Sequence, residues 1–237
     1  MKKRGNSAKI LFITGTSTGV GKTLLTALLL HHLREAGIRA AAIKPFCSGG
    51  TQDVCLLRQI QDRELPESEV SPFYFKEPVA PLVAERIHKE FIRLPEVLAH
   101  VRKVAASCEV LLVEGSGGLM VPLGEGYFVA DVISSLACGV IVVASNQLGT
   151  INHTLLTVKH LQTLKRFAKN GVGDLKVVLM DRSCRDESSI SNEAVLRELL
   201  APVPLVKVPF LGRNTCSVGM VKKNGRKIAK TLASIFD

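Results

Sequence analysis

Residues 15–23 constrain the fold of this chain more than any other stretch. Their order is Gly-Thr-Ser-Thr-Gly-Val-Gly-Lys-Thr, with an apolar, strand-like run at residues 9–13 before them and a helix-forming run at 24–33 after them. A glycine-rich turn that ends in Gly-Lys-Thr between a strand and a helix is typical of loops whose backbone N–H groups bind phosphate. We therefore predict a phosphate-binding loop carried by a strand–turn–helix unit.

The last residues of this loop carry the predicted chemistry. The Lys22 ammonium is expected to reach the β- and γ-phosphates of a nucleotide, and the Thr23 hydroxyl is expected to hold Mg²⁺. The spacing is longer than usual, because five residues separate Gly15 from Gly21 and Thr16 stands where the first glycine is expected. An ordinary glycine-rich turn is the alternative interpretation of the same residues.

Apolar runs recur along the chain and alternate with stretches that favour helix. The strand-like runs are residues 40–43, 110–113, 140–143 and 177–180, with a shorter one at 205–208, and the helical stretches include 94–107, 151–167 and 192–200. Continuous apolar strands that alternate with helices predict a parallel sheet buried on both faces. We expect a single α/β domain over residues 1–237, with a three-layer, doubly wound, mainly parallel sheet of the P-loop NTPase type.

Composition narrows the compartment and the partners. Of the 237 residues 46% are hydrophobic, but no apolar run approaches the length of a membrane span, so no membrane partner is expected. The basic residues 1–7 lead into the first strand without a signal-type apolar stretch, and the six cysteines are scattered, which predicts a cytoplasmic protein with reduced thiols. The net charge of +10 is spread along the chain and aromatic residues make up only 5%, so no nucleic-acid partner is expected either.

Charged residues follow two of these apolar runs, where ligands of such sheets collect. Lys44 follows the run at 40–43, where its charge could neutralise a transferring phosphoryl group, or where it could simply be a solvated lysine at a sheet edge. Glu114 follows the run at 110–113, an arrangement in which the acid reaches Mg²⁺. Asp53 is a second candidate for that cation, although either carboxylate could merely cap a turn or a helix.

Two glycine-containing turns complete the pattern. Gly115, Gly117 and Gly118 are expected to let the backbone approach a ligand closely. Residues 145–153 lead into a helix, with Gly149 as the turn residue and Thr150 as the N-cap. His153 in the first helical turn is expected to be solvated or locally hydrogen-bonded rather than to act as a base.

These motifs together resemble one known family. They are residues 15–23, Lys44-Pro45-Phe46-Cys47-Ser48-Gly49, Glu77-Pro78 with Pro81, Val113-Glu114-Gly115-Ser116-Gly117-Gly118 and Leu148-Gly149-Thr150-Ile151-Asn152-His153. Over nearly its full length the chain resembles the dethiobiotin synthetases, which share the longer spacing of the phosphate loop. That family converts 7,8-diaminononanoate, CO₂ and MgATP into dethiobiotin, ADP and phosphate, through a carbamate and a carbamic-phosphoric anhydride.

The resemblance implies a role for each matching residue. Lys22 and Lys44 are the expected catalytic cations, because a carbamate anion must be brought to a γ-phosphate of like charge. Mg²⁺ is expected on Thr23, Asp53 and Glu114. The residues expected to bind ATP, with those just named, are Gly19, Val20, Gly21, Lys22, Leu24, Gly115, Ser116, Gly117, Met180, Asp181, Pro209, Phe210 and Leu211. The residues expected to bind the diamine are Thr18, Ser48, Gly118, Thr150, Ile151 and Asn152, the last three taking its carboxylate across the interface of a homodimer.

Two positions depart from the family's usual pattern. Ser17 stands where the family usually has Asp, and Met180 stands where it commonly has an Asn that reads the adenine edge. An Asn side chain can donate and accept hydrogen bonds, whereas a thioether offers only a weak acceptor. The sequence therefore does not predict how selective the protein is for the base of its nucleotide.

Two other classes of P-loop protein remain as alternatives. A switch ATPase of the partitioning or metal-insertion type would carry a second lysine early in the loop, where this chain has Ser17, and would lack the segment from Lys44 to Ser48. A GTPase or regulatory nucleotide-binding module would carry an Asn-Lys-x-Asp motif, which the sequence does not contain, although Asp181 could accept hydrogen bonds from guanine.

Overall fold

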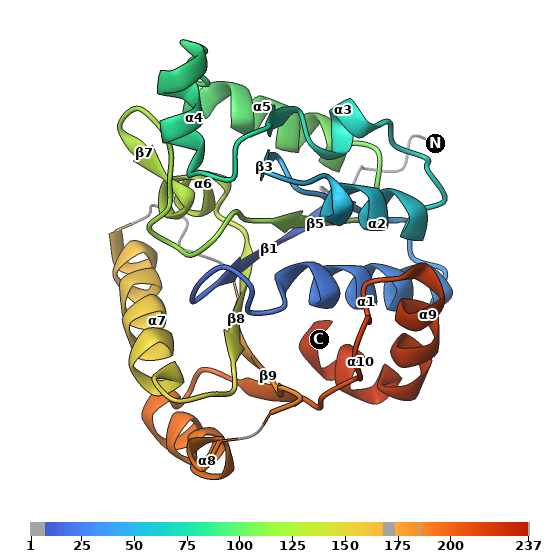
Figure 1. Ribbon diagram of the computed structural model, residues 1–237, viewed down its shortest axis with the longest axis vertical. Helices are drawn as coiled ribbons and strands as arrows, with labels where there is room; N and C mark the ends of the chain where they lie inside the picture. The colour runs from blue at the N-terminus through green and yellow to red at the C-terminus, as the bar shows by residue number, and fades with distance from the viewer. Residues whose placement is uncertain (1–7, 168–173, 185, 237) are drawn as a thin grey trace, which may run out of the picture.

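Six parallel strands form the central sheet of the computed structural model, which describes residues 8–167, 174–184 and 186–236 (Figure 1). The sheet has the order β10-β9-β8-β1-β5-β2, and every pair in it is parallel. Its strands are β1 (Lys9–Gly15), β2 (Ala40–Ile43), β5 (Val110–Glu114), β8 (Gly139–Ser145), β9 (Leu175–Met180) and β10 (Leu205–Val208). The predicted strands are therefore confirmed, each with the predicted residues or up to two more at an end. The basic residues 1–7 lie outside the described part of the chain.

The helices lie on the two faces of this sheet (Figure 1). They are α1 (Lys22–Glu35), α2 (Gln52–Ile60), α3 (Glu67–Val70), α4 (Pro81–His88), α5 (Leu94–Ala105), α6 (Val129–Leu136), α7 (Thr150–Phe167), α8 (Ser188–Leu200), α9 (Val218–Lys227) and α10 (Ala229–Phe236). Short strand pairs, β3 (Phe46–Ser48) with β4 (Phe73–Phe75) and β6 (Pro122–Gly124) with β7 (Tyr127–Phe128), add two small sheets that the sequence did not indicate.

The core explains the three layers. Side chains alternate between the faces of a strand, so Phe12 of β1 packs with buried residues of α4 to α8, whereas Leu11 and Ile13 pack with those of α1, α2, α9 and α10. Both clusters consist of buried apolar side chains, which is why the strands of this sheet read as unbroken apolar runs in the sequence. The predicted three-layer, doubly wound fold is confirmed.

The strand order places the site. β1 lies between β5 and β8. The chain passes from β1 to the edge strand β2, returns to β5, and then crosses β1 to β8, β9 and β10 on the other side. A crevice beyond the carboxyl ends of the strands is expected at such a reversal of strand order. The loop from β1 to α1, which is the predicted phosphate loop, begins there. No helix in the described residues is long and apolar enough to cross a membrane.

Candidate active site around the phosphate loop

The phosphate loop has the conformation that its glycines predict. Gly19 and Gly21 have φ angles of 74° and 101°, in the left-handed region that favours glycine, and Gly21 directly precedes the first residue of α1. A Cβ on Gly15 would lie 2.8 Å from the Val20 side chain and 3.1 Å from Lys22 Nζ, so the turn closes too tightly for any other residue. The loop therefore presents the N-terminus of α1 to the crevice, as an anion site requires.

Three charged side chains and one hydroxyl group meet beside this loop. Lys44, directly after β2, forms ion pairs with Asp53 in the first turn of α2 and with Glu114 at the end of β5, where Nζ lies 3.0 Å from Oε1. The same Glu114 oxygen accepts a hydrogen bond of 2.8 Å from the Thr23 hydroxyl. The parallel register sets Glu114 beside Ile13, two residues before the end of β1. Four predicted catalytic or metal-binding side chains, those of Thr23, Lys44, Asp53 and Glu114, are thus joined by direct contacts.

The pKa values of the two lysines of the site are shifted in opposite directions. Burial lowers the pKa of Lys22 to about 8, against the attraction of Glu114 and with the help of the nearby Lys44 charge. Lys22 Nζ donates to the backbone oxygen of Ser17 at 2.9 Å. Burial also acts to lower the pKa of Lys44, but Glu114 and Asp53 outweigh it and hold this pKa above its ordinary value. Lys44 is therefore a fixed cation, and Lys22 is a buried amine without a carboxylate bonded to it.

The carboxylates form a set of oxygen donors that suits Mg²⁺. Glu114 is buried, and its second oxygen, Oε2, has no hydrogen-bond partner among the described residues. A buried carboxylate oxygen without a donor is costly, and a hard cation would satisfy it. No group of three or more His, Cys, Asp or Glu that could hold a metal occurs in the described residues.

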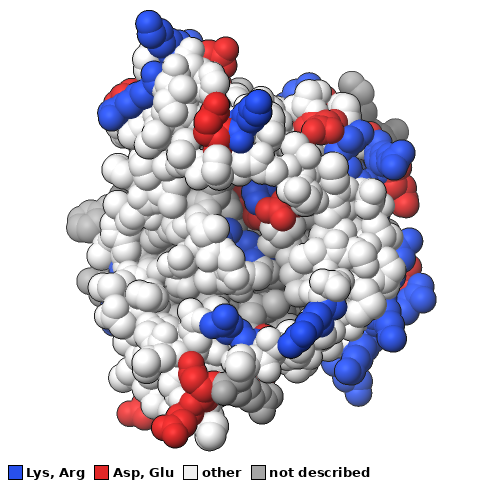
Figure 2. Space-filling view, in the orientation of Figure 1, with Lys and Arg blue, Asp and Glu red and all other residues white. Residues whose placement is uncertain are grey.

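A cavity of about 390 Å³ opens beside the charged cluster. It is lined by Thr18, Lys44, Ser48, Asp53, Pro78, Val79, Ala80, Pro81, Ser116, Gly117 and Val121. Thr18 and Ser48, both predicted to hold substrate, are therefore in the same cavity as the Lys44 ammonium. The Ser48 hydroxyl is buried and has no partner among the described residues. Figure 2 shows acidic and basic side chains at the bottom of a hollow in this face of the molecule.

A second cavity, of about 230 Å³, lies on the other side of the phosphate loop. It brings together nine of the residues predicted to bind the nucleotide, which are Gly19, Val20, Gly21, Leu24, Met180, Asp181, Pro209, Phe210 and Leu211. Ser145, Arg182, Ser183, Gly212 and Thr215 also line it. We call it the base cavity, because Met180 and residues 209–211, which the family resemblance places near the adenine, line it. A Cβ on Gly21 would lie 3.4 Å from Met180, so this methionine packs against the loop itself.

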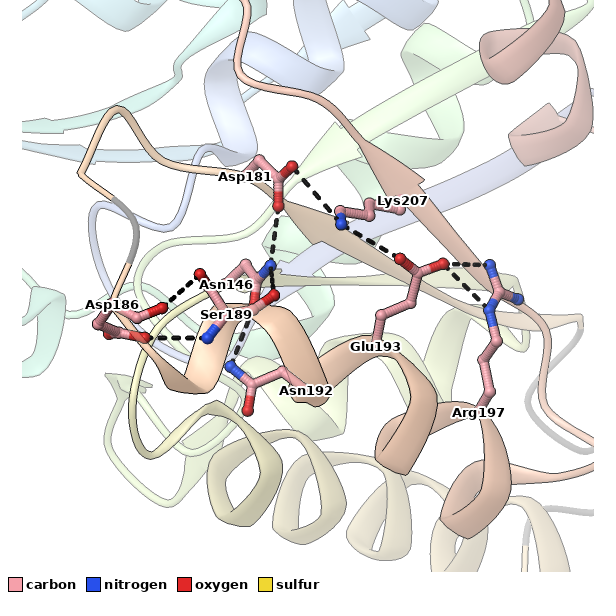
Figure 3. Close-up of polar contacts among 8 residues, drawn as sticks. All are labelled: Asn146, Asp181, Asp186, Ser189, Asn192, Glu193, Arg197 and Lys207. Carbon is pink, nitrogen blue, oxygen red and sulfur yellow. Dashed lines mark hydrogen bonds and ion pairs between the residues drawn. The ribbon is translucent and has the colours of Figure 1, made fainter.

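The Asp181 carboxylate does not stand free in the base cavity. Its side chain is 3% exposed, Oδ1 accepts a hydrogen bond of 2.8 Å from Asn146 Nδ2, and Oδ2 lies 3.7 Å from Lys207 Nζ (Figure 3). A carboxylate that reads guanine must offer its oxygens to the base. The contacts of Asp181 argue against the GTPase alternative.

The glycines after β5 lie where a side chain would meet the protein, and Gly117 also lines the cavity that contains Lys44. A Cβ on Gly115 would lie 2.8 Å from the Phe12 ring, and one on Gly118 would lie 3.4 Å from the backbone oxygens of Gly15 and Thr16. The loop after β5 must therefore pack directly on the phosphate loop, which is why it lacks side chains at these positions. Ser116 Oγ donates to the Phe46 oxygen at 2.7 Å, so this hydroxyl holds β3 in place.

The structure leaves the predicted carboxylate segment apart from both cavities. Thr150, Ile151 and Asn152 are not among the residues that line the cavities beside the charged cluster and the base. The predicted N-cap role of Thr150 is wrong: this residue is the first of α7, and its buried hydroxyl has no partner among the described residues. The turn before it ends at Gly149, whose φ is 88° and whose oxygen accepts from His153 N. His153 is exposed, as predicted.

A third cavity, of about 520 Å³, lies between the phosphate loop and α7, and most of its wall could not be predicted from the sequence. It is lined by Thr16, Ser17, Thr18, Gly118, Leu119, Met120, Val121, His153, Leu156, Thr157 and His160. Met120 and Leu156 are 53% and 62% exposed, which is unusual for large apolar side chains beside a cavity. Sequence reasoning missed them because each is an ordinary apolar residue in its own segment.

Comparison with known proteins agrees with this geometry. The family described as "AAA domain" matches residues 9–209. The "ATP-dependent dethiobiotin synthetase BioD" of Bacillus licheniformis is 36% identical over 205 residues, which cover 84% of this chain and 85% of that protein. The protein of the same name from Bacillus subtilis subsp. natto is 38% identical over 210 residues, covering 83% and 85%, and that from Methanococcus vannielii is 36% identical over 170 residues, covering 72% and 78%.

Solved structures show the fold alone. The septum site-determining protein MinD of Pyrococcus horikoshii, complexed with Mg-ADP, superposes with a TM-score of 0.59 at 20% identity, covering 97% of this chain and 96% of that one. A ParA family ATPase from Chlorobium tepidum gives a TM-score of 0.57 at 16% identity, covering 96% and 98%. The partitioning type of ATPase thus shares the architecture, whereas the relatives at 36% to 38% identity carry the synthetase name. The chain belongs to the dethiobiotin synthetase family.

Proposed function

We propose that the protein is an ATP-dependent dethiobiotin synthetase that converts 7,8-diaminononanoate and CO₂ into dethiobiotin. One amine adds to CO₂ and loses a proton, which gives a carbamate. The carbamate oxygen then takes the γ-phosphoryl group as its bond to ADP breaks, which gives a carbamic-phosphoric anhydride. The second amine attacks the carbonyl carbon, the C–O bond to phosphate breaks, and the ureido ring closes.

One observation carries this proposal beyond family membership. Lys44 stands between two carboxylates at the entrance of a cavity that also holds the hydroxyls of Thr18 and Ser48. A carbamate and a γ-phosphate repel each other, so their approach needs cations and donors arranged in advance. We assign Thr18 and Ser48 to the carbamate, and Lys44 to the charge that develops between carbamate and phosphate. Lys22 is assigned to the phosphates, as the loop geometry favours.

Mg²⁺ is part of the proposal. Thr23, Asp53 and Glu114 would hold it, and when bound it would neutralise charge on the β- and γ-phosphates. Because Lys44 now contacts the same two carboxylates, cation and ammonium compete for these oxygens. Lys44 is therefore expected to give up at least one of its carboxylates when the site is loaded, and to turn its charge toward the substrate cavity. The base cavity would take adenine.

The exposed apolar side chains support a homodimer. Leu148, directly before Gly149 and α7, is 80% exposed, and Met120 and Leu156 are exposed at the rim of the third cavity. A second copy that covered this surface would bury them, and it could bring residues 150–152 to the substrate of its neighbour. We also propose that residues 1–237 work as one domain, because α9 and α10 complete the core over α1. Sedimentation of the purified protein tests the dimer.

Product analysis tests the reaction itself. The protein is incubated with MgATP, 7,8-diaminononanoate and ¹³C-bicarbonate, and phosphate release and product mass are measured. The proposal requires dethiobiotin that carries the label in its ureido carbon, and phosphate release that depends on both the diamine and bicarbonate. A switch ATPase of the partitioning type would release phosphate without them, and that result would replace the proposed function.

A further inference from the structure

A buried amide at the end of β8 joins two parts of the site (Figure 3). Asn146 is 2% exposed. Its backbone N–H donates to the Met180 oxygen at 2.8 Å. Its side-chain Nδ2 donates to Asp181 Oδ1 at 2.8 Å and to the Ser189 oxygen at 3.1 Å, and Oδ1 accepts from Asn192 Nδ2 at 3.0 Å. Both N–H bonds of the amide and its oxygen are therefore used, which fixes the orientation of this side chain.

Two of the hydrogen bonds of Asn146, those to Met180 and Asp181, lead to the base cavity. Met180 and Asp181 both line that cavity, and Asp181 N donates to the Val208 oxygen at 2.9 Å. Lys207 extends the contact, with Nζ 3.7 Å from Asp181 Oδ2 and 3.2 Å from Glu193 Oε2 (Figure 3). The wall that faces the base is thus tied to β8, to β10 and to α8. β9 is already paired with β8 as far as Met180, and the Asn146 side chain extends that pairing to the carboxylate of Asp181.

The hydrogen bond that Asn146 accepts from Asn192 leads to the turn before α7. Asn192 Nδ2, which donates to Asn146, also lies 3.2 Å from the Gln147 oxygen, and Leu148 N donates to Asp186 Oδ2 at 3.0 Å. This turn leads directly into residues 150–152, which the family resemblance assigns to the carboxylate of the diamine. The same amide therefore sets both the wall of the base cavity and the entry to the segment assigned to the other substrate.

We propose that Asn146 is a positioning residue that couples nucleotide binding to diamine binding. The inference rests on the proposed function, since the two ligands are assigned there. A base that settles against Met180 and Asp181 restrains the hydrogen bonds of Asn146, and the turn before α7, which shares these bonds through Asn192, is restrained with them. Each ligand then raises the affinity for the other by the same factor, as linkage requires.

Calorimetry on the full-length protein tests the coupling. The dissociation constant of 7,8-diaminononanoate is measured alone, with a non-hydrolysable ATP analogue, and with inorganic tripolyphosphate, a probe that fits the phosphate loop but has no base. We expect the analogue to tighten diamine binding at least about fivefold, the lower end of common coupling factors, and tripolyphosphate to do so clearly less. Equal effects of the two compounds would overturn the proposal, because the base cavity would then carry no coupling.

The variant Asn146→Asp tests the residue without opening a cavity. Its second oxygen would face the Asp181 carboxylate instead of an N–H donor, so the bond is lost and the analogue's effect on the diamine should fall to within about twofold. The double variant Asn146→Asp with Asp181→Asn exchanges donor and acceptor across the same bond, and we expect it to restore the coupling. If the single variant keeps full coupling, or if it fails to fold and the double variant folds but shows none, the inference is wrong.

Two further variants separate a positioning role from a general loss of structure. Lys207→Met removes the ion pairs to Asp181 and Glu193 and should weaken the ATP analogue while leaving the affinity for the diamine alone unchanged. Asp186→Ala removes the acceptor of Leu148 N, Ser188 Oγ and Ser189 N and should do the reverse. A merely structural Asn146 would lower the melting temperature without this split. Failure of the proposed function is distinct, because the wild-type protein would then form no labelled dethiobiotin.

Discussion

The two sides of the phosphate loop both contain clustered charges, but the clusters differ in what they leave unpaired. On the reaction side, Lys44 bridges two carboxylates, yet Glu114 Oε2 and Ser48 Oγ stay without partners among the described residues. On the base side, Asp181 is bonded to Asn146 and lies near Lys207. Buried polar atoms without partners are costly, so we expect the unpartnered atoms of the reaction side to be satisfied by bound ligands. The polar atoms of the base side already bond to one another and fix the position of the cavity wall.

This comparison ranks the effects of substitution. Side chains on the reaction side are expected to act on the transition state, where charge develops, and their removal should cost most of the rate. Substitutions in the base cavity are expected to change the preference among nucleotides, and this change should be smaller than the loss of rate on the reaction side.

The largest effect is expected from Lys44→Ala. Its cation acts on the carbamate and the transferring phosphoryl group, so kcat should fall at least about a thousandfold, or roughly 4 kcal/mol, while the affinity for an ATP analogue changes little. Phosphate release and calorimetry measure the two quantities. Retention of more than about a tenth of kcat, a loss below roughly 1.4 kcal/mol, would contradict the assignment. Lys103→Ala is the control, since that lysine pairs with Glu69 in a salt bridge in which its own side chain is 68% exposed.

Glu114→Gln should act through the metal. The amide keeps the size of the side chain but removes the charge that a cation needs, so the Mg²⁺ concentration for half-maximal activity should rise at least about tenfold, as loss of groups that support a metal site commonly does. The KM for the diamine should change much less. Glu85→Gln is a matched control, because Glu85 is also buried and lies outside the site cavities. Superimposable Mg²⁺ titrations of variant and wild type would remove Glu114 from the site.

The lowered pKa of Lys22, on the reaction side, predicts that nucleotide affinity depends on pH. Its pKa is lowered to about 8 in the folded protein, and phosphates that bind beside it favour the charged form and raise this pKa. Nucleotide binding therefore takes up a proton above pH 8, and affinity should fall by up to about tenfold per pH unit there while staying flat below. Lys22→Arg keeps its charge throughout and should remove the slope. An unchanged slope in this variant would assign the titration to another group.

The same pKa has a consequence for stability. A lysine whose folded pKa lies below its unfolded value of 10.5 destabilises the folded state while it must carry its charge there. The unfolded chain binds the extra proton between about pH 8 and 10.5, so the contribution of Lys22 to the free energy of unfolding becomes less unfavourable as the pH rises through that window. Lys22→Met should therefore stabilise the ligand-free protein most below pH 8. The difference between the two proteins should shrink toward pH 10.5.

The reaction side could be predicted from the sequence because position alone defines it. Lys44 and Glu114 each stand one residue beyond a buried apolar run or at its end, and parallel strands bring such positions to one edge of the sheet. The phosphate loop is a contiguous motif. These residues need no information from distant parts of the chain beyond the order of strands.

The base side could not be predicted in the same way. The side-chain partners of Asn146 lie 35 to 46 residues away, directly after β9 and on α8, and they depend on how α8 is rotated against the sheet. Asn192 reads in the sequence as one polar residue of a helix. The protein groups next to the glycines after β5 could not be predicted either: a Cβ on Gly115 would meet the Phe12 ring, and Gly118 lies against the phosphate loop. Their close approach to a ligand stays a prediction. A glycine in the sequence indicates that a side chain would not fit at that position, but it does not indicate which neighbouring group occupies the space.

The smallest effect is expected from Met180→Asn, at the wall of the base cavity. An Asn there could donate to and accept from an adenine edge, whereas the thioether of Met180 offers an apolar contact and a weak acceptor. One added polar contact contributes roughly 0.5–1.5 kcal/mol, so the preference for ATP over GTP and CTP should rise by about two- to tenfold. The phosphate loop is unchanged, and overall affinity should therefore change less than selectivity does. The measurement is kcat/KM for the three nucleotides in wild type and variant, with Met120→Asn as the same chemical change outside the base cavity. A wild type that already prefers ATP by about a thousandfold, roughly 4 kcal/mol, with no gain from the variant, would show that the base is read by other groups, such as the backbone near Asp181 and Pro209.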